Sequence, residues 1–404
     1  MSDLQRSFAK AQLNRIPPEP IIFDEHEEEQ DDISSLRATS PNDSSSSASS
    51  ASSTGTIVPS PSRNLFERPK ASAIKSRSAP LPWQDFFAQD LHFPNSQHPD
   101  LIHHAYLTPP SSNGPLIVTH HGAGSSGLSF AAFFSELGSL LPTAGILSLD
   151  ARSHGYTTSP PSLPLDLTLA TLATDLHFIL TSTATHLSWP KLPDILLLGH
   201  SLGGAVVTQV AHQRLLGSSL LAYGVLDVVE GSAMDALQSM ESYLSTRPRA
   251  FPSLASGIEW HIRSRTIRNS SSARVSVPPL LQLAQTSAGQ EQYLWRTDLD
   301  ATKPFWENWF VGLSKKFLEA RGGKLLLLAG TDRLDKELMI GQMQGKYQLQ
   351  VFPEAGHFVH EDLPAKTANV VADFYRRNER GSLVLPPKVD ELIRQGKVKA
   401  AQAT

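Results

Sequence analysis

The chain contains no cysteine among its 404 residues. A disulfide framework, a thiolate nucleophile, thiolate-bound zinc and iron–sulfur clusters are therefore all excluded. If the protein carries out nucleophilic chemistry, the nucleophile has to be Ser, Thr, Asp, Glu or Lys.

Long apolar runs and a strong excess of one charge are also missing. No stretch reaches the roughly 18 apolar residues of a transmembrane helix, and the first twenty residues lack the apolar segment of a secretory signal. Lys and Arg number 35 against 39 Asp and Glu, a net charge of −4, which argues against nucleic acid or a membrane surface as a partner. We expect a soluble, intracellular protein whose partners are recognised at particular sites.

The composition divides the chain into unequal parts. Hydrophobic residues make up 40% of the whole, but residues 1–80 contribute few of them, because an acidic run over 24–32 and a serine-rich tract over 44–53 fill this segment. Such sequence cannot bury enough apolar surface to offset chain entropy, so we expect a disordered N-terminal tail. A second tail is expected over 381–404. Residues 81–380 are the right length for one large α/β domain.

Within that domain, short apolar runs alternate with stretches of helical periodicity. Apolar residues three and four apart between Leu165 and Leu180 predict a crossover helix, and 365–377 predicts a closing helix. This alternation indicates an α/β fold with a mostly parallel central sheet flanked by helices. The predicted strands are 116–119, 146–149, 195–198, 221–229, 324–329 and 347–352.

A GxSxG motif follows the predicted strand at 195–198. It reads Gly199-His200-Ser201-Leu202-Gly203, and the apolar residues after it can begin a buried helix. A serine at the tip of such a strand–turn–helix is the nucleophile of α/β hydrolases, and the N–H groups at the start of the helix favour negative charge beside it. The motif alone is weak, because a glycine turn can simply pack a helix against a strand. Its context favours Ser201 as a nucleophile.

A glycine-rich loop, His120–Gly127, directly follows the strand at 116–119. In an acyl-transfer enzyme a backbone N–H of this loop joins the N–H after the nucleophile to bind the oxyanion. We expect Ala123 and Leu202 to supply these two donors. A phosphate-binding loop is the alternative, but the lysine of GxxxxGK[ST] is absent.

The general base is expected late in the chain, because the order in this fold is serine, acid, histidine. His357 follows the last predicted strand and precedes the closing helix, where a loop can place its imidazole over the serine. His360, three residues further on, is the rival. A histidine with no catalytic role is the simpler interpretation of either, and the position favours His357.

Two aspartates compete for the third position of a catalytic triad. Asp332 follows the strand at 324–329, where α/β hydrolases most often place the acid. Asp227 ends an apolar run 26 residues after the serine, and a carboxylate there is costly to bury without a partner. Spacing alone does not separate them.

Several blocks are more specific than these motifs. They include Asp227-Val-Val-Glu-Gly231, Ile340-Gly-Gln-Met-Gln-Gly-Lys346 and His360-Glu-Asp362. Over about 83–377 the chain resembles the protein phosphatase methylesterase 1 family of α/β hydrolases, and the first two blocks are not shared by α/β hydrolases at large. The resemblance covers the candidate domain and leaves out the N-terminal tail.

The resemblance implies an α/β-hydrolase fold with a helical cap insertion at about 231–320. It implies a serine carboxylesterase, cytoplasmic or nuclear, that removes the methyl ester from the C-terminal leucine of the protein phosphatase 2A catalytic subunit. Ser201 and His357 match the family's nucleophile and base, and Asp227 rather than Asp332 matches its acid. Neither a metal nor an organic cofactor is implied.

Two departures from the family pattern are visible. The glycine-rich loop has Ala123 where a third glycine is usual, which leaves the backbone donor intact. The polar segment at about 278–290 has diverged, which could alter substrate contacts.

The cap is rich in tryptophan and arginine, residue types that suit a surface gripping a peptide. A cap packed only for stability, with solvated arginines, explains any single one of them equally well. The residues are Trp260, Trp295, Trp306, Trp309, Arg247, Arg249, Arg263, Arg265 and Arg268. A general small-molecule carboxylesterase and a phosphatase-binding regulator remain the alternative functions.

Overall fold

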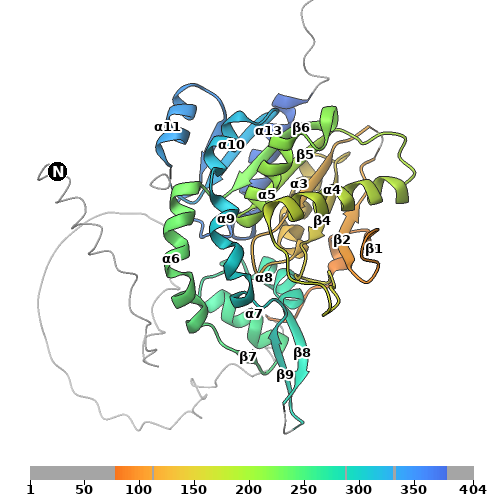
Figure 1. Ribbon diagram of the computed structural model, residues 1–404, viewed down its shortest axis with the longest axis vertical. Helices are drawn as coiled ribbons and strands as arrows, with labels where there is room; N and C mark the ends of the chain where they lie inside the picture. Colours follow the sequence, from red (N-terminus) through yellow and green to blue (C-terminus); the bar gives the residue numbers. More distant parts are fainter. Residues whose placement is uncertain (1–77, 112, 287–288, 331–333, 380–404) are drawn as a thin grey trace, which may run out of the picture. The chain divides into compact units, whose positions relative to one another are not determined.

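A computed structural model describes residues 78–111, 113–286, 289–330 and 334–379 (Figure 1). Residues 1–77 of the N-terminal tail expected over 1–80 lie outside the described residues, and so do the tail expected over 381–404 and Asp332. Residues 78–80, expected to belong to the N-terminal tail, are in contact with the domain, because the Ala79 carbonyl accepts a hydrogen bond from Arg274 Nε at 2.7 Å.

A sheet of eight strands forms the centre of the domain. In spatial order the strands are β1 (Gln89–Pro94), β2 (Ile102–Thr108), β4 (Gly145–Asp150), β3 (Leu116–His120), β5 (Ile195–His200), β6 (Leu220–Leu226), β10 (Gly323–Leu328) and β11 (Gln348–Val351). Strand β2 pairs antiparallel with both β1 and β4, and the last six strands in this order are parallel to one another. The mostly parallel sheet predicted from the sequence is confirmed.

The six predicted strands correspond to β3, β4, β5, β6, β10 and β11. One boundary was wrong: the strand expected over 221–229 ends at Leu226, because Asp227 takes a positive φ of 51° and turns the chain out of the sheet. Strands β1 and β2 were not predicted. Their histidines, His92, His103 and His104, interrupt the apolar pattern that marks the other strands.

Both faces of the sheet are covered by helices, which explains why its strands are continuously apolar. Leu116 and Val118 of β3 pack into one apolar cluster, and Ile117 between them packs into the other. The first cluster lies under α4 (Leu169–His186), α5 (Leu202–Gln213) and α10 (Leu313–Glu319), and the second under α3 (Ala131–Leu140) and α13 (Pro364–Asn378). The two predicted helices are α4 and α13. Helix α4 begins later than expected, because Thr168 caps it by accepting from the Thr171 N–H.

The segment between β6 and β10 forms a cap with a small core of its own. A helical cap was expected, but the cap also contains an antiparallel sheet of three strands in the order β7-β9-β8. In Figure 1 the green and teal elements of the cap lie together at one end of the central sheet. They are α6 (Glu230–Thr246), β7 (Ala250–Phe251), α7 (Leu254–Arg263), α8 (Ser270–Ser276), β8 (Leu281–Gln285), β9 (Glu291–Trp295) and α9 (Trp306–Phe310).

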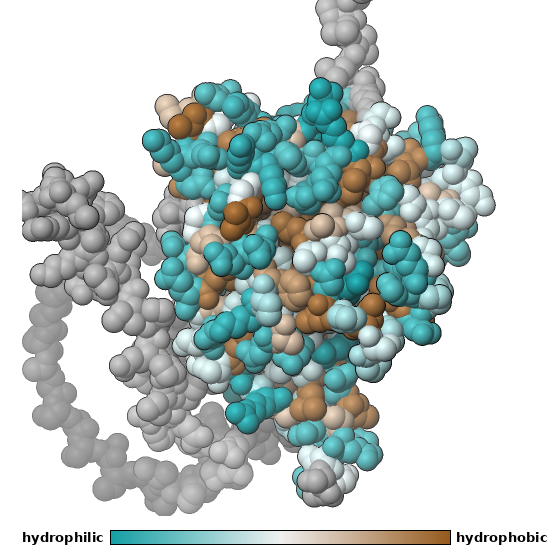
Figure 2. Space-filling view, viewed as in Figure 1, coloured by the Kyte–Doolittle hydropathy of each residue, from teal (hydrophilic) through white to brown (hydrophobic). Residues whose placement is uncertain are grey.

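Two short helices, α11 (Lys336–Met343) and α12 (Val359–Asp362), flank β11. On the face drawn in Figure 2, apolar and polar side chains are interspersed. The most exposed large apolar side chain among the described residues is Met343 of α11, at 88%. No helix in the described part of the chain combines the length and apolarity needed to cross a membrane.

Candidate active site

Ser201 occupies the turn between β5 and α5 with a strained backbone, φ 52° and ψ −118°. Side chains on the flanking residues would block this turn. A Cβ on Gly199 would lie 2.1 Å from the Gly203 carbonyl oxygen, and a Cβ on Gly203 would lie 2.0 Å from that of His120. The glycines of the motif are therefore required by the close approach of backbone to backbone, and they hold Ser201 at the start of the helix.

Asp227 and His357 form the second part of the site. Asp227 Oδ2 lies 2.9 Å from His357 Nδ1, and Asp227 Oδ1 accepts the Ala329 N–H at 2.8 Å. The aspartate side chain is fully buried, whereas the imidazole is 46% exposed. A carboxylate at Nδ1 fixes the tautomer that carries its proton there and leaves the Nε2 lone pair free to act as a base.

The loop that carries His357 lies between β11 and α12 and is held from two sides. The Nε2–H of His200 donates to the His357 carbonyl at 2.9 Å, and the Gly356 N–H donates to Asp362 Oδ2 at 2.7 Å. The cap holds the same loop, because the Arg268 N–H donates to Asp362 Oδ1 and its guanidinium to the Glu354 carbonyl. Asp362, of the His-Glu-Asp block, thus positions the histidine loop.

The rival histidine occupies a different environment. His360 is fully buried, its ring is stacked on Phe130 at 4.3 Å, and neither of its nitrogens has a partner among the described residues. Burial, with a smaller contribution from His357, lowers the pKa of His360 to about 3. His360 does not line the cavity at Ser201, so the geometry favours His357 as the base.

The glycine-rich loop lies directly against the serine. A Cβ on Gly122 would come within 3.1 Å of Ser201 Cβ, and Ala123, Gly124 and Leu202 line the same cavity. Among the described residues, nothing accepts from the backbone N–H of Ala123 or Leu202. Both donors predicted from the sequence are therefore available to an oxyanion at this position.

Two neutral histidines hold this loop, and their role was not predicted from the sequence. His121 donates from Nδ1 to the Gly122 carbonyl and accepts the Ala151 N–H at Nε2. His154 Nε2 accepts the Gly124 N–H at 2.9 Å. Burial lowers the pKa of both imidazoles, so their Nε2 atoms remain acceptors at neutral pH.

A cavity of about 440 Å³ connects Ser201 and His357 with the cap. This volume lies within the usual range for a small-ligand site. Aromatic and aliphatic side chains dominate the wall, and three arginines of the cap also line it. The residues are Leu237, Met240, Trp260, Trp295, Trp306, Trp309, Phe310, Phe358, Arg247, Arg265 and Arg268. Glu361 lies in the wall too, and burial raises its pKa well above the ordinary value.

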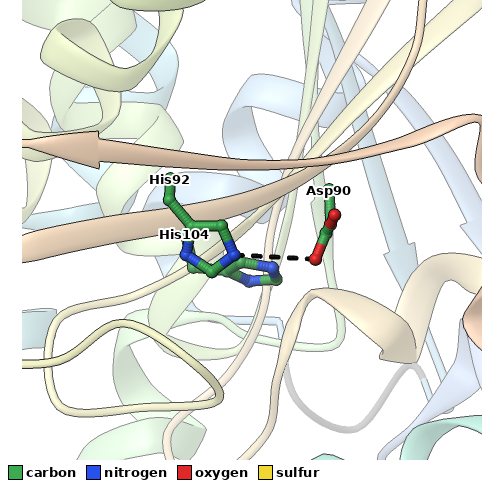
Figure 3. Close-up of side chains that lie close together, drawn as sticks. All are labelled: Asp90, His92 and His104. Carbon is green, nitrogen blue, oxygen red and sulfur yellow. Dashed lines mark ion pairs between the residues drawn. The ribbon is translucent and has the colours of Figure 1, made fainter.

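A possible metal site lies elsewhere, on β1 and β2. Asp90, His92 and His104 offer ligand atoms within 4.8 Å of one another, and in Figure 3 the Asp90 and His92 side chains extend from the same strand towards His104. His104 Nδ1 is bonded to Asp150 Oδ2 at 2.8 Å, which leaves its Nε2 for a ligand role. None of the three residues lines the cavity, so chemistry at Ser201 does not involve them.

A nucleophile turn after β5, an acid after β6 and a histidine after β11 are the arrangement of a serine α/β hydrolase. A family model described as "Alpha/beta hydrolase family" matches residues 117–370. The solved structure of E-2-(acetamidomethylene)succinate hydrolase superposes with a TM-score of 0.56 at 17% identity, covering 71% of this chain and 99% of that one. This likeness supports the fold alone.

Curated relatives give a narrower assignment. A protein phosphatase methylesterase 1 of Aspergillus fumigatus is 60% identical over 398 residues, covering 97% of this chain and 93% of the relative. Those of Gibberella zeae and Schizosaccharomyces pombe are 59% and 46% identical, covering 98% and 76% of this chain and 100% and 87% of the relatives. The chain belongs to the protein phosphatase methylesterase 1 family, and it is a carboxylic-ester hydrolase.

Proposed function

We propose that the protein removes the methyl ester from the C-terminal leucine of the protein phosphatase 2A catalytic subunit. The observation that carries the proposal is the identity of up to 60% along nearly the whole chain with relatives named protein phosphatase methylesterase 1. The cavity suits such a substrate, because its apolar wall can contact the leucine side chain while the rest of the bound peptide extends out of the cavity.

The three residues of the site supply the chemistry. His357 Nε2 takes the proton of Ser201 Oγ as this oxygen bonds to the ester carbonyl carbon. Asp227, bonded to Nδ1, stabilises the imidazolium that forms. The negative charge on the carbonyl oxygen is bound by the N–H groups of Ala123 and Leu202.

The tetrahedral intermediate then collapses. The bond to the methoxy oxygen breaks, and methanol leaves with the proton from the imidazolium. A water molecule gives a proton to His357 and its oxygen bonds to the acyl carbon. Ser201 departs with that proton, which releases a free carboxylate after ionisation and restores the enzyme.

A general small-molecule carboxylesterase would use the same residues, and a phosphatase-binding regulator would need none of them. The deciding experiment incubates the purified protein with methylated phosphatase and, separately, with a simple aryl ester. We expect loss of the methyl group from the phosphatase and no loss with Ser201→Ala. Turnover of the aryl ester alone would indicate the general esterase, and tight binding without turnover of either substrate would indicate the regulator.

The cellular location stays a prediction. We expect the protein in the cytoplasm, the nucleus or both, and a fluorescent fusion followed by microscopy would test this.

A further inference from the structure

Among the charged residues that line the cavity, Arg247 is the one whose positive charge is least compensated by the described residues around it. It caps the C-terminal end of α6, is half-buried and lines the cavity that contains Ser201. Its guanidinium carbon lies 3.6 Å from the centroid of the Trp295 ring. This cation–π contact holds the side chain in place.

The indole is itself fixed, so it forms a rigid support. Trp295 Nε1–H donates to the Pro248 carbonyl at 2.8 Å, and its ring packs edge-on against Phe251 and Trp260 at centroid distances of 5.4 and 5.9 Å. An aromatic face attracts the charge of the guanidinium, but it does not supply the in-plane oxygen acceptors that the N–H groups need.

Arg247 lacks such acceptors in the described part of the chain, where its guanidinium makes neither an ion pair nor a hydrogen bond. The charged or titratable groups that interact with it electrostatically are Tyr243, His261 and the exposed Asp300. Burial lowers the pKa of Arg247, but a guanidinium stays protonated at neutral pH. The site thus holds a partly desolvated cation whose donors are used by none of the described residues.

The other two arginines of the cavity differ from Arg247. Arg268 donates to the Glu354 carbonyl and lies 3.6 Å from an oxygen of Asp362, so its charge is compensated. Arg265 is exposed, so water can serve its donors. The cavity wall carries three arginines against one carboxyl group, that of Glu361, whose pKa is raised well above its ordinary value by burial. Its interior is therefore electropositive and suited to an anion.

We propose that Arg247 is a specificity residue that binds a carboxylate on the acyl part of the substrate, upstream of the ester-bearing residue. This inference rests on the proposed function, in which the substrate is a peptide with a methyl ester at its C-terminus. The ester is neutral, and so are the peptide carbonyls. An acidic side chain is the group in such a peptide that matches a charged fork of donors, and it would give the enzyme a preference for acidic sequences.

The test compares peptides that differ in one group. A panel of short peptides ending in leucine methyl ester carries Glu at one of the four positions before the leucine, each paired with the same peptide carrying Gln. We expect kcat/KM of the wild-type enzyme to be about 10- to 100-fold higher for Glu than for Gln at one of these positions, as for charge-assisted hydrogen bonds. Arg247→Gln should bring this ratio close to one, and Arg247→Lys should restore it in part.

Arg249→Gln is the matched control. Arg249 is exposed, lies two residues away and does not line the cavity, so removing its charge should leave the Glu/Gln ratio at the wild-type value. Thermal melting of each variant checks folding. If Arg247→Gln does not fold, Arg247→Lys, which keeps the charge but not the fork of donors, should still lower the Glu/Gln ratio below the wild-type value, and an unchanged ratio would overturn the proposal.

Each outcome has a distinct meaning. Equal rates of the wild-type enzyme on every Glu/Gln pair would overturn the role of Arg247 and leave the proposed function standing. A preference that survives in Arg247→Gln would also overturn it. If an Arg247 variant changes inhibition by the product, the peptide with a free C-terminal carboxylate, but leaves the Glu/Gln ratio unchanged, the proposal is refuted. Arg247 would then bind the carboxylate of the product and not an acidic side chain of the substrate. Turnover of an aryl ester with none of any peptide ester would instead contradict the proposed function.

Discussion

The choice of Asp227 as the acid can be tested with a change of one atom. Asp227→Asn keeps the shape of the side chain, but the amide must meet two donors, the Ala329 N–H at one oxygen and the His357 Nδ1–H at the other. If the NH2 group faced Ala329, a buried backbone donor would be left without a partner, at a cost of about 1–3 kcal/mol. We therefore expect the amide oxygen to stay on Ala329 and the NH2 group to face the imidazole.

This orientation defines the magnitude of the effect. An NH2 group at Nδ1 requires a lone pair there, so the proton of the imidazole moves to Nε2, where it can no longer accept the serine proton. In serine proteases the same substitution lowers turnover by about 10⁴, and we expect a similar loss here. The assay is turnover of a neutral aryl ester, after circular dichroism has shown that the variant is folded. Asp332→Asn, at the competing aspartate outside the described residues, serves as the comparison. A loss of less than tenfold in Asp227→Asn, or a larger loss in Asp332→Asn, would refute the assignment.

Three further predictions concern the nucleophile, the buried histidine and the N-terminal segment. A fluorophosphonate probe should label the wild-type protein and not Ser201→Ala, as in-gel fluorescence would show, and equal labelling would contradict the role of the serine. His360 is neutral in the folded state, because its pKa there is lowered to about 3. In the unfolded chain it gains a proton below about pH 6.5. The free energy of unfolding therefore falls as the pH drops from 6.5 towards 3. His360→Phe keeps a ring on Phe130 but removes the titrating group. It should reduce the fall in the free energy of unfolding between pH 7 and 5 by up to about 1.4 kcal/mol per pH unit, as urea unfolding would measure. The same pH dependence in the variant and the wild type would contradict this role of His360. Deleting residues 1–77, whose composition predicts a disordered tail, should leave the melting temperature and turnover unchanged. Extending the deletion through Leu81 should lower the melting temperature, because it removes the hydrogen bonds of Ala79 and Leu81 with Arg274. A lower melting temperature after deletion of residues 1–77 alone would show that the tail stabilises the domain.

The parts of the fold that the sequence predicted are those dictated by local physics. The turn at Ser201 was predictable, because its glycines are required where backbone approaches backbone within a few residues. The parallel strands were predictable, because burial on both faces leaves only apolar residues in them. The order of serine and histidine followed from the fold class that these elements define.

The parts that were missed depend on contacts between distant residues. His154 supports Gly124 across 30 positions, and no local pattern marks it. Strand β1 is polar at alternate positions because it lies at the edge of the sheet, so its sequence resembles a loop. The isolation of Arg247 is a property of everything around it, and composition gave only the abundance of arginine in the cap.

The backbone at Ser201 has a consequence for the evolution of the enzyme. Ser201 and Asp227 both hold positive φ angles, 52° and 51°, and such conformations cost side-chain-bearing residues about 1–3 kcal/mol each. Ser201→Gly would relieve this strain, and the greater chain entropy of glycine in the unfolded state would offset roughly 0.5–1 kcal/mol of the gain. The net effect is stabilising, so the inactive variant should melt a few degrees higher than the wild type. A selection for heat resistance alone would therefore favour chains that have lost the nucleophile, and only a simultaneous demand for turnover keeps serine at this position.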